Sequence, residues 1–339
     1  MKAMQLTRIG LMSADEDPLD PVELPVPEPG TGEIRIRLLA CGVCHTELDE
    51  IEGRTRPPRL PIIPGHEAVG RVDALGDQAI RHAVGDRVGV GWIHHSTGDL
   101  RENLSPAFRA TGRDANGGYA EFMTVPEQYA YPIPNCFSDI EAAPLLCAGA
   151  VGYRAIKLTG VHDSQAIGLT GFGGSAHLVL QLVRHCFPNS PTAVFARDPA
   201  QREHALALGA SWAGATENRA PFALDAIIDT TPAWRPVVEA LANLKPGGRL
   251  VINAIRKEDG DKDALLRLRY ETHLWQEKQI QSVANVTAAD IAEFLPLAAT
   301  VPLKPEVEVY AFADANRALR DLRFAPLRGA KVLAFTAPG

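Results

Sequence analysis

A glycine-rich turn between a buried strand and a helix places the strongest constraint on how this chain can fold. The turn reads Gly171-Phe172-Gly173-Gly174-Ser175-Ala176, a G-x-G-x-x-A form of the dinucleotide-binding fingerprint. Residues 166–170 before it read as a short buried strand, and residues 175–186 read as an apolar-periodic helix. The first glycine permits a tight turn, Gly173 lets the backbone approach a pyrophosphate, and the N–H groups that begin the helix face the phosphates. A turn without a ligand is the alternative, and this placement disfavours it.

Strand and helix signals alternate along the segments that follow the turn. Further strands are predicted at residues 193–196, 224–229 and 249–252, and further helices at residues 199–208 and 234–244. Residues 246–248 (Pro-Gly-Gly) are predicted to form a turn before the last strand. Alternating units of this length predict an α/β fold with a doubly wound parallel sheet.

The rest of the chain has a different texture. Residues 1 to about 150 hold short apolar runs that alternate with polar residues and are interrupted by Pro and Gly, which is typical of β-rich structure. From about residue 284 the chain resembles this first part again, and it includes a helix-like segment at residues 314–323. The sequence therefore predicts two domains, one formed by residues 1–152 with 284–339 and the other by residues 153–283.

Composition excludes several classes of protein. The 339 residues, 46% apolar and 22% charged, suit a globular protein of about two domains. A formal net charge of −7 argues against nucleic-acid binding. We see no signal segment and no stretch near the ~18 apolar residues of a membrane span, so we expect a cytoplasmic protein that binds no membrane. Five cysteines do not suggest a disulfide framework, and their reduced thiols are free to bind a metal.

Three separated pieces of the first domain carry metal-ligating side chains. They are Cys44, the triplet Gly65-His66-Glu67, and Cys147. Two thiolates and an imidazole can hold zinc and leave a fourth position open, as in a catalytic rather than a structural site. A metal with an open position and a nicotinamide cofactor together predict hydride transfer to or from an alcohol or carbonyl compound held at zinc.

Each piece has a plainer interpretation when taken alone. Cys41 and Cys44 form a C-x-x-C motif, which could be half of a structural zinc site, a redox dithiol or two unrelated cysteines. No second C-x-x-C exists, and the strand-rich context lacks the helix start that a redox dithiol needs. Cys147 alone reads as a small buried residue, and a lone His66 would more often be a core or surface residue.

Several motifs, in a fixed order along nearly the whole chain, resemble the zinc-dependent alcohol dehydrogenases of the medium-chain dehydrogenase/reductase family. The matching segments are residues 41–47 (CGVCHTE), 64–70 (PGHEAVG), 85–88 (GDRV), 116–121 (NGGYAE) and 144–149 (PLLCAG). The resemblance implies a GroES-like β-rich catalytic domain and a Rossmann domain that binds NAD or NADP.

The resemblance also implies a set of zinc ligands. Cys44, His66 and Cys147 would bind the catalytic zinc. Glu67 would take the fourth position or exchange there with water or substrate. The residue at the position of Cys41 is usually not a ligand in the family, so Cys41 is left out of the set.

Three further residues receive roles by the same resemblance. Thr46 would supply the hydroxyl that hydrogen-bonds the alcohol and relays its proton, and His45 would lie against the pyrophosphate. Trp92 corresponds to a residue in the wall of an apolar substrate pocket, with plain core packing as the alternative.

The lobe after Trp92 departs from the family pattern. The family's well-known members carry four closely spaced cysteines there, which bind a second, structural zinc, whereas residues 94–104 here contain no cysteine. The adjacent His94 and His95 cannot supply four ligands, so we expect a polar loop. The chain resembles a bacterial subset that lacks this lobe, and we expect one catalytic zinc per chain and no structural zinc.

The proton path and the cofactor choice stay open at this point. Where many family members have a relay histidine, this chain has Asp49, which is either a substitute proton acceptor or a surface acid. The second strand of the cofactor domain ends in Arg197-Asp198. An acidic residue there would bind the ribose of NAD, and an arginine would accommodate the 2′-phosphate of NADP. The alignment slightly favours NADP.

The sequence therefore predicts a zinc-dependent oxidoreductase that interconverts small primary alcohols and aldehydes with NAD(P)(H). Two alternatives remain: a zinc-free quinone or enoyl reductase of the same superfamily, and a non-catalytic metal- or nucleotide-binding protein on the same fold. The expected partners are the small-molecule substrate and further copies of the chain in a dimer or tetramer.

Overall fold

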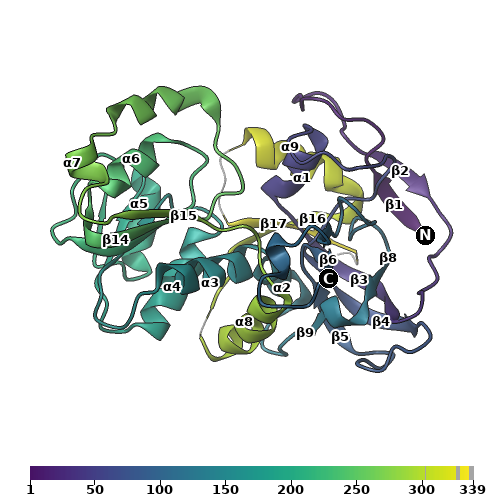
Figure 1. The fold of residues 1–339 in the computed structure, drawn as a ribbon. Coiled ribbons are helices and arrows are strands. Elements are labelled where there is room, and N and C mark those ends of the chain that lie inside the picture. Colours follow the sequence, from purple (N-terminus) through teal and green to yellow (C-terminus); the bar gives the residue numbers. More distant parts are fainter. Residues whose placement is uncertain (302, 326–328, 336–339) are drawn as a thin grey trace. The chain divides into compact units, whose positions relative to one another are not determined.

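The computed structural model describes residues 1–301, 303–325 and 329–335 (Figure 1). The chain forms two compact units. Unit 1 comprises Met1–Ala150, Val286–Ala299 and Lys304–Gly339, and unit 2 comprises Val151–Asn285 and Thr300–Leu303. Each unit is built around its own large sheet.

Unit 2 contains a six-stranded sheet in the order β12-β11-β10-β13-β14-β15, in which every neighbouring pair is parallel. The strands are β10 (Ile167–Thr170), β11 (Thr192–Phe195), β12 (Trp212–Gly214), β13 (Leu224–Asp229), β14 (Leu244–Ile252) and β15 (Gln279–Ser282). The helices are most of α3 (Ala148–Thr159), then α4 (Ala176–Cys186), α5 (Pro199–Ala207), α6 (Arg235–Leu241), α7 (Tyr270–His273) and the 3-10 segment η4 (Asp259–Arg267). The predicted doubly wound parallel sheet is thereby confirmed.

The glycine-rich turn follows the central strand of this sheet. Strand β10 pairs with β11 on one side and with β13 on the other, so the strand order reverses at this point. All four residues of β10 are buried, which matches its continuous apolar sequence. Ligands of open α/β sheets bind outside the carboxyl ends of the strands at such a reversal, and Gly171 lies directly there.

One predicted turn in unit 2 is wrong. Residues 246–248 were expected to separate the preceding helix from a strand at 249–252, but β14 begins at Leu244 and includes them. The helix before it, α6, ends at Leu241. Strand β14 tolerates the interruption because Gly247 adopts a φ of 71° and the register against β13 shifts there, so the Pro-Gly-Gly segment forms an irregularity within the strand.

Unit 1 contains a seven-stranded sheet in the order β16-β17-β3-β4-β5-β9, with β8 also paired to β3. Its strands are β3 (Glu33–Val43), β4 (Ala68–Leu75), β5 (Arg87–Val90), β8 (Phe122–Pro126), β9 (Ala130–Pro132), β16 (Val307–Ala311) and β17 (Ala330–Ala334). Two small pairs are β1 (Lys2–Gln5) with β2 (Asp20–Glu23), and β6 (Ile93–His95) with β7 (Arg109–Ala110). Except for β16 with β17, these strand pairs are antiparallel.

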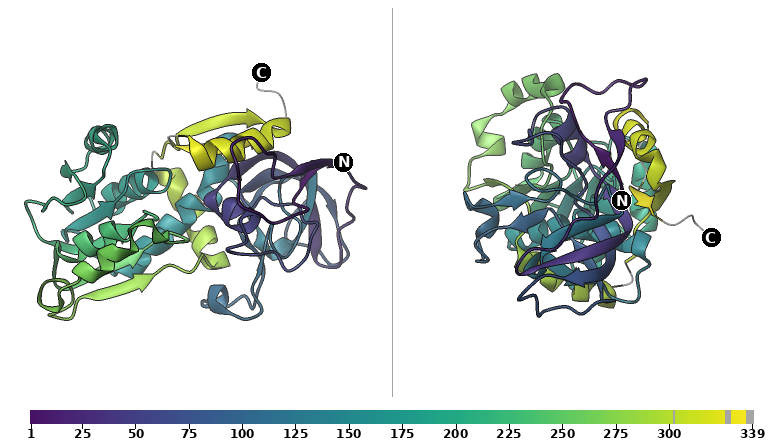
Figure 2. Two further views of the ribbon diagram at one scale, coloured as in Figure 1. Left: turned by 90° about the horizontal axis from the view of Figure 1, so that it is seen from above. Right: turned by 90° about the vertical axis from the view of Figure 1, so that its right-hand side faces the viewer.

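Unit 1 also contains several short helices. They are α1 (His45–Ile51), α2 (Asp139–Ala142), α8 (Ala288–Thr300), α9 (Ala315–Phe324) and the 3-10 segments η1 (Glu102–Leu104), η2 (Glu127–Tyr129), η3 (Ala143–Leu146) and η5 (Phe312–Asp314). Of these, α2, α9, η3 and η5 contact strands of its large sheet. Figure 2 shows α9 lying along β16 and β17, and its buried residues Ala315, Ala318, Leu319 and Leu322 follow a helical period. Strand β17 pairs antiparallel with residues 40–43 of β3. This late segment of the chain therefore becomes part of the sheet of unit 1.

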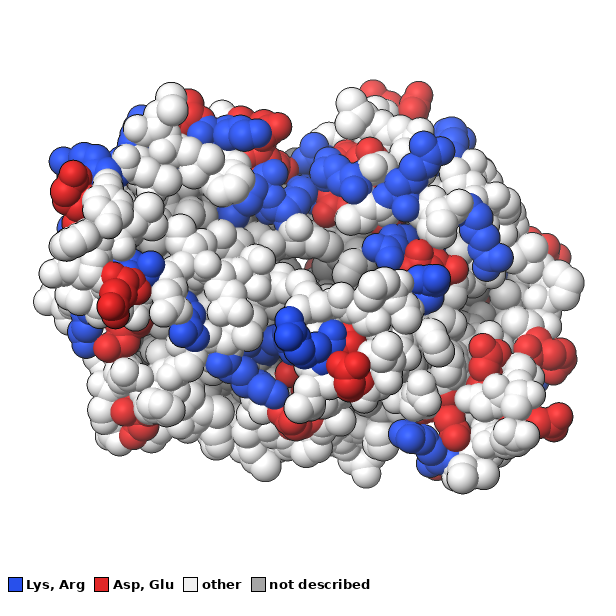
Figure 3. Space-filling model, viewed as in Figure 1, with Lys and Arg blue, Asp and Glu red and all other residues white. Residues whose placement is uncertain are grey.

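Two surface properties follow from the described residues. Among them, we find no helix with both the length and the apolar character needed to cross a membrane. On the face drawn in Figure 3, Lys and Arg side chains are interspersed with Asp and Glu.

Candidate functional site

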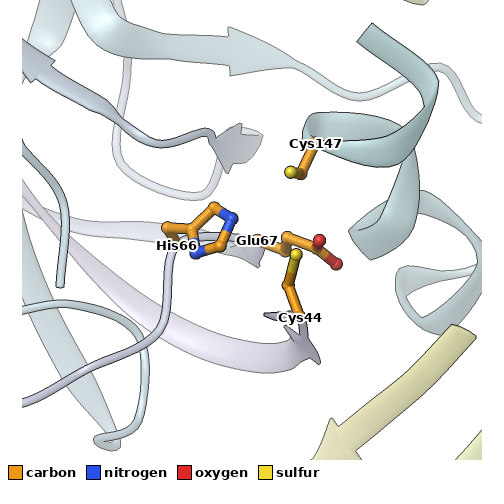
Figure 4. A group of neighbouring side chains, drawn as sticks. All are labelled: Cys44, His66, Glu67 and Cys147. Carbon is orange, nitrogen blue, oxygen red and sulfur yellow. The ribbon is translucent and has the colours of Figure 1, made fainter. Parts of the chain in front are cut away.

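Four side chains from three distant segments of unit 1 converge on one point (Figure 4). Cys44 joins β3 to α1, His66 and Glu67 directly precede β4, and Cys147 lies between η3 and α3. One ligand atom from each lies within 4.8 Å of the others, and within the described ranges this is the only such group of three or more His, Cys, Asp or Glu residues. Ligands about 2.0–2.3 Å from a zinc ion lie roughly 3.3–3.8 Å apart in a tetrahedron, so the cluster has the dimensions of a zinc site.

Glycines make the local backbone compatible with this cluster. Gly65, with a φ of +98°, turns the chain just before His66. A Cβ at Gly42 would approach Glu67 Oε2 to 1.7 Å. Strand β3 can therefore pass under the Glu67 carboxylate only because residue 42 has no side chain.

The His66 ring is held by a carboxylate that the sequence analysis did not single out. Its Nδ1 lies 2.5 Å from Glu47 Oε1, and Glu47 Oε2 accepts a hydrogen bond of 2.8 Å from the Cys44 backbone N–H. Since a carboxylate accepts, Nδ1 carries a proton, and Nε2 is the ring nitrogen left to bind a metal. Nε2 is buried with no hydrogen-bond partner among the described residues. Carboxylate–histidine–metal arrangements have this geometry, so the donor set fits zinc.

The two thiols of the cluster differ in acidity. A hydrogen bond from the Cys147 thiol, and His66 beside it, lower the pKa of Cys44 well below its usual range. The same hydrogen bond, together with burial, raises the pKa of Cys147 well above its usual range. A divalent cation at this point would bind both sulfurs as thiolates and displace their protons. Burial, reinforced by the Cys44 charge, also raises the pKa of Glu67.

The remaining residues predicted around the metal lie on α1. Thr46 is buried, with its hydroxyl 3.7 Å from Cys44 Sγ, and His45 begins the helix. Asp49 is only 1% exposed, and its Oδ1 lies 2.6 Å from Arg54 Nε. The interpretation of Asp49 as a surface acid is therefore wrong, because the chain after α1 folds back and brings Arg54 to it. Cys41 is buried and is not part of the cluster.

A second carboxyl on α1, Glu50, was also missed by the sequence analysis. It is fully buried, and neither oxygen has a hydrogen-bond partner among the described residues. Burial, reinforced by the charge of Glu47, raises the pKa of Glu50 well above its usual range. Its place in the acidic segment Glu47-Leu48-Asp49-Glu50 gave no indication of burial, because such a run normally faces solvent.

The glycine-rich turn of unit 2 has the backbone that a dinucleotide site requires. Gly171 has a φ of +76°, and a Cβ there would come within 3.0 Å of Thr230 and Thr231. At Gly173 a Cβ would meet no atom within 4 Å, which leaves open space in front of the backbone. Gly174 and Ser175 lead directly into α4, whose N-terminus can bind phosphate.

Side chains of the turn make contacts within unit 2. Phe172 is buried and packs edge-on against His204, with ring centroids 5.5 Å apart. Ser175 Oγ accepts a hydrogen bond of 3.2 Å from Asn253 Nδ2 at the end of β14.

The two candidate ribose-binding residues have different environments. Asp198 is the N-cap of α5, and its Oδ1 accepts a hydrogen bond of 3.0 Å from the Ala200 N–H. Arg197, one residue earlier, is exposed. The acidic side chain at this strand end is thus engaged by the helix, whereas the guanidinium is accessible.

Known proteins with this architecture identify the family. Residues 30–135 match the alcohol dehydrogenase GroES-like domain, which confirms that part of the prediction. The sequence is 41% identical to the probable alcohol dehydrogenase AdhA of Mycobacterium tuberculosis, over 98% of this chain and 97% of that protein. The fold matches a crystal structure of an NAD-dependent alcohol dehydrogenase with a TM-score of 0.86 (23% identity, 99% of this chain and 100% of that one). It also matches the Helicobacter pylori cinnamyl alcohol dehydrogenase complexed with NADP(H) with a TM-score of 0.84 (21% identity, 100% and 99%). The chain therefore belongs to the zinc-dependent alcohol dehydrogenase family of the medium-chain dehydrogenase/reductase superfamily.

Proposed function

We propose that this alcohol dehydrogenase interconverts small primary alcohols and aldehydes by hydride exchange with NAD(P)(H), using one zinc ion per chain. Unit 1 is the catalytic zinc domain, with Cys44, His66 and Cys147 as ligands and Glu67 at the fourth position. Unit 2 is the cofactor domain. The observation that carries the proposal is the buried, unpartnered Nε2 of His66, which lies in a cluster with two thiols and a carboxyl.

The residues around the cluster have complementary roles in this reaction. A zinc ion bound there supplies Lewis acidity that stabilises negative charge on the substrate oxygen. Glu47 orients His66 and fixes its tautomer. Thr46, next to Cys44, relays the proton: on oxidation its hydroxyl accepts the proton of the alcohol while passing its own proton on toward solvent, and on reduction the transfers run in reverse. Glu67 balances charge and exchanges with water or substrate.

The proton path beyond Thr46 does not have an open carboxylate at Asp49. Arg54 holds that side chain at 2.6 Å, and Arg54 also contacts Glu52 Oε2 at 2.7 Å. We therefore propose that Asp49 holds α1 in place through its ion pair with Arg54. It would affect proton transfer only through the position of that helix. In Asp49→Asn, a dependence of kcat on pH like that of the unmodified enzyme would support this role. If kcat of the variant no longer changed with pH where that of the unmodified enzyme does, the role would be contradicted.

We propose NADP as the preferred cofactor. Asp198 uses its carboxylate to cap α5, while Arg197 is exposed at the end of the same strand. A free guanidinium at this place suits a 2′-phosphate, and an occupied carboxylate is unavailable to a ribose hydroxyl. In Arg197→Ala, KM for NADPH should rise about 10-fold or more while KM for NADH changes little. A preference for NADH in the unmodified enzyme would contradict the proposal.

We also propose that the enzyme is a homo-oligomer, a dimer or tetramer, assembled through the edge of the unit 2 sheet. All four residues of β15 are exposed, and the strand pairs with β14 alone in the described part of the chain. Exposed apolar side chains lie in and near it, namely Tyr270, Trp275 and Ile280. An unpaired edge of this kind pairs with a second copy unless it is protected. Light scattering should show a smaller species for Ile280→Glu but not for Leu206→Glu, an exposed position on α5.

A cytoplasmic location follows from the same chemistry. Cys44 and Cys147 must stay reduced to bind zinc, and reducing compartments preserve thiols.

The deciding experiment is a steady-state assay of the pure protein with NADH and NADPH against a panel of aldehydes, with zinc measured on the same sample. Turnover at about one zinc per chain is expected. Turnover without zinc would favour the zinc-free reductase, and cofactor binding without turnover would favour the non-catalytic alternative.

A further inference from the structure

The peptide between Gly173 and Gly174 is weakly restrained by its own residues. Neither residue has a side chain, so the backbone on both sides of this peptide can rotate with little steric hindrance. Gly174 is partly exposed, and its N–H has no acceptor among the described residues. Whether this donor meets a ligand therefore depends on what keeps the peptide in the orientation that the structure shows.

The side chain of His177, in the first turn of α4, holds this peptide. The Gly173 carbonyl accepts two hydrogen bonds from His177, one of 3.3 Å from its backbone N–H and one of 3.2 Å from its ring Nδ1. Since a carbonyl oxygen can only accept, Nδ1 carries a proton here. The backbone bond is long, because N–H···O distances are commonly about 2.9–3.0 Å, and the ring adds a second donor. The side chain itself is held in place, since His177 is only 4% exposed.

Holding the carbonyl also fixes the direction of the N–H at the other end of the peptide. The Gly173–Gly174 peptide is trans, so its C=O and its N–H point in opposite directions. The carbonyl faces α4, and the Gly174 N–H therefore faces away from the helix. The turn has room for a ligand, because a Cβ at Gly173 would meet no atom within 4 Å. Ser175, the N-cap of α4, forms no side-chain capping bond, so the cap does not compete for the donors at this helix start.

We infer that His177 is a positioning residue for the cofactor, whose ring keeps the Gly173–Gly174 peptide turned so that the Gly174 N–H donates to the pyrophosphate. This inference rests on the proposed function, because it requires NAD or NADP at the turn. His177 acts through the backbone rather than by contact with the cofactor. Without its ring, the peptide between the two glycines would sample other orientations. Those that turn the carbonyl oxygen towards the phosphates would oppose binding, because both groups carry negative charge.

Two substitutions separate the hydrogen bond of the ring from its packing. Asparagine is smaller than histidine, but its side-chain amide can donate to a carbonyl as Nδ1 does. Leucine fills the space of the imidazole and favours a helix, but it donates no hydrogen bond. His177→Leu is therefore the milder change for stability, whereas the loss of the donor makes it the harsher change for cofactor binding.

The test measures cofactor affinity and stability of the whole chain side by side. Titrations followed by NADH and NADPH fluorescence give Kd, and thermal unfolding without cofactor gives the melting temperature. For the cofactor that the unmodified protein binds more tightly, we expect Kd to rise about 3- to 10-fold in His177→Leu, which corresponds to one neutral hydrogen bond. In His177→Asn, Kd should stay within about 2-fold of the unmodified value. The melting temperature should fall more in His177→Asn than in His177→Leu, because the smaller side chain leaves a cavity.

Gln181→Leu is the matched control. The Gln181 side chain also donates to a backbone carbonyl of α4, that of His177, at 3.1 Å. This bond lies one turn further from the glycine-rich turn, so its loss should leave Kd unchanged. A rise as large as that in His177→Leu would show that a general loosening of α4 weakens binding, which would refute the positioning role.

The outcomes distinguish this inference from the proposed function. If His177→Leu binds the cofactor as tightly as His177→Asn or the unmodified protein, the positioning role of His177 is refuted and the proposed function stands. If the unmodified protein binds neither NADH nor NADPH, the proposed function itself fails.

Discussion

At the scale of single residues, Glu47 decides how the side chains of the proposed zinc site are held. Its two oxygens bridge the His66 ring and the Cys44 backbone, and it has no exposed surface. One carboxylate therefore fixes two of the proposed zinc ligands at once. Partners of this kind are as important for the metal as the ligands they orient.

Removing this carboxylate should weaken zinc binding. In Glu47→Ala, Nδ1 of His66 loses its acceptor, and we expect zinc affinity to fall about 10–100-fold. Competition with a chromogenic chelator measures the change. The zinc affinity of Glu47→Gln, which keeps an acceptor oxygen, should lie between those of Glu47→Ala and the unmodified protein. Equal zinc retention by the alanine variant and the unmodified protein would show that Glu47 does not position His66.

At the scale of elements, ion pairs join α1 to α9. Glu52, just after α1, contacts Arg54 Nη2 at 2.7 Å and Arg323 Nε at 3.1 Å. Burial disfavours the charged form, but hydrogen bonds and charges from the two arginines outweigh it and lower the pKa of Glu52. This carboxylate therefore stabilises the folded protein above its ordinary pKa, and the contribution is lost as the pH falls through the lowered value.

Glu52→Gln should remove this acid-sensitive contribution. We expect the free energy of unfolding to drop by about 1–2 kcal/mol at pH 7 and to depend less on pH in the acid range. Urea unfolding at several pH values measures both. Glu28→Gln is the control, because Glu28 also contacts an arginine but is 83% exposed. An unchanged pH slope in Glu52→Gln would refute the account.

Glu102 holds together the segment after Trp92, in which residues 94–104 contain no cysteine. Its Oε2 accepts from the Gly98 N–H and the Tyr129 hydroxyl, both at 3.0 Å, and its Oε1 accepts from the Ala288 N–H at 2.6 Å. These bonds tie η1 to η2 and to the start of α8. The carboxylate thus cross-links three segments of unit 1.

Glu102→Ala should loosen this segment. It leaves buried donors unpaired, and we expect a loss of about 2–3 kcal/mol in the free energy of unfolding. Limited proteolysis should then cut within residues 96–112 before the rest of unit 1. Glu102→Gln, which keeps one acceptor oxygen, should be cut more slowly. Resistance of both variants to cleavage would contradict this role.

At the scale of the whole molecule, the proposed zinc ligands and the glycine-rich turn belong to different units. The ligand cluster lies wholly in unit 1, and the glycine-rich turn lies wholly in unit 2. Removing the metal should therefore affect catalysis without unfolding the cofactor domain.

Chelation tests this separation. Treatment with a zinc chelator should abolish turnover while NADPH still binds to unit 2, as followed by its fluorescence. One equivalent of zinc per chain should restore activity. A requirement for two zinc ions per chain would contradict the expected absence of a structural zinc.

The amino-acid sequence by itself determined the chemical inventory and the local structure. Apolar runs and periodic helices identified β10, β11, β13, part of β14 and the helices α4, α5 and α6, because hydrophobic period and turn residues act over a few residues. The short or exposed elements β12, β15, η4 and α7 were not predicted. The G-x-G-x-x-A turn and the thiol, imidazole and carboxyl residues could also be read directly. Irregular backbone within a strand could not be predicted in this way. The Pro-Gly-Gly segment is typical of a turn, but Gly247 lets β14 continue through it.

Only the tertiary structure decided which of these side chains meet. It brought Glu47 to His66, paired Asp49 with Arg54, and buried Glu50 completely. Along the chain these three acids belong to one charged run that looks solvated. The contacts of the three side chains differ because different distant parts of the chain pack against each side of α1. No local sequence pattern encodes that packing.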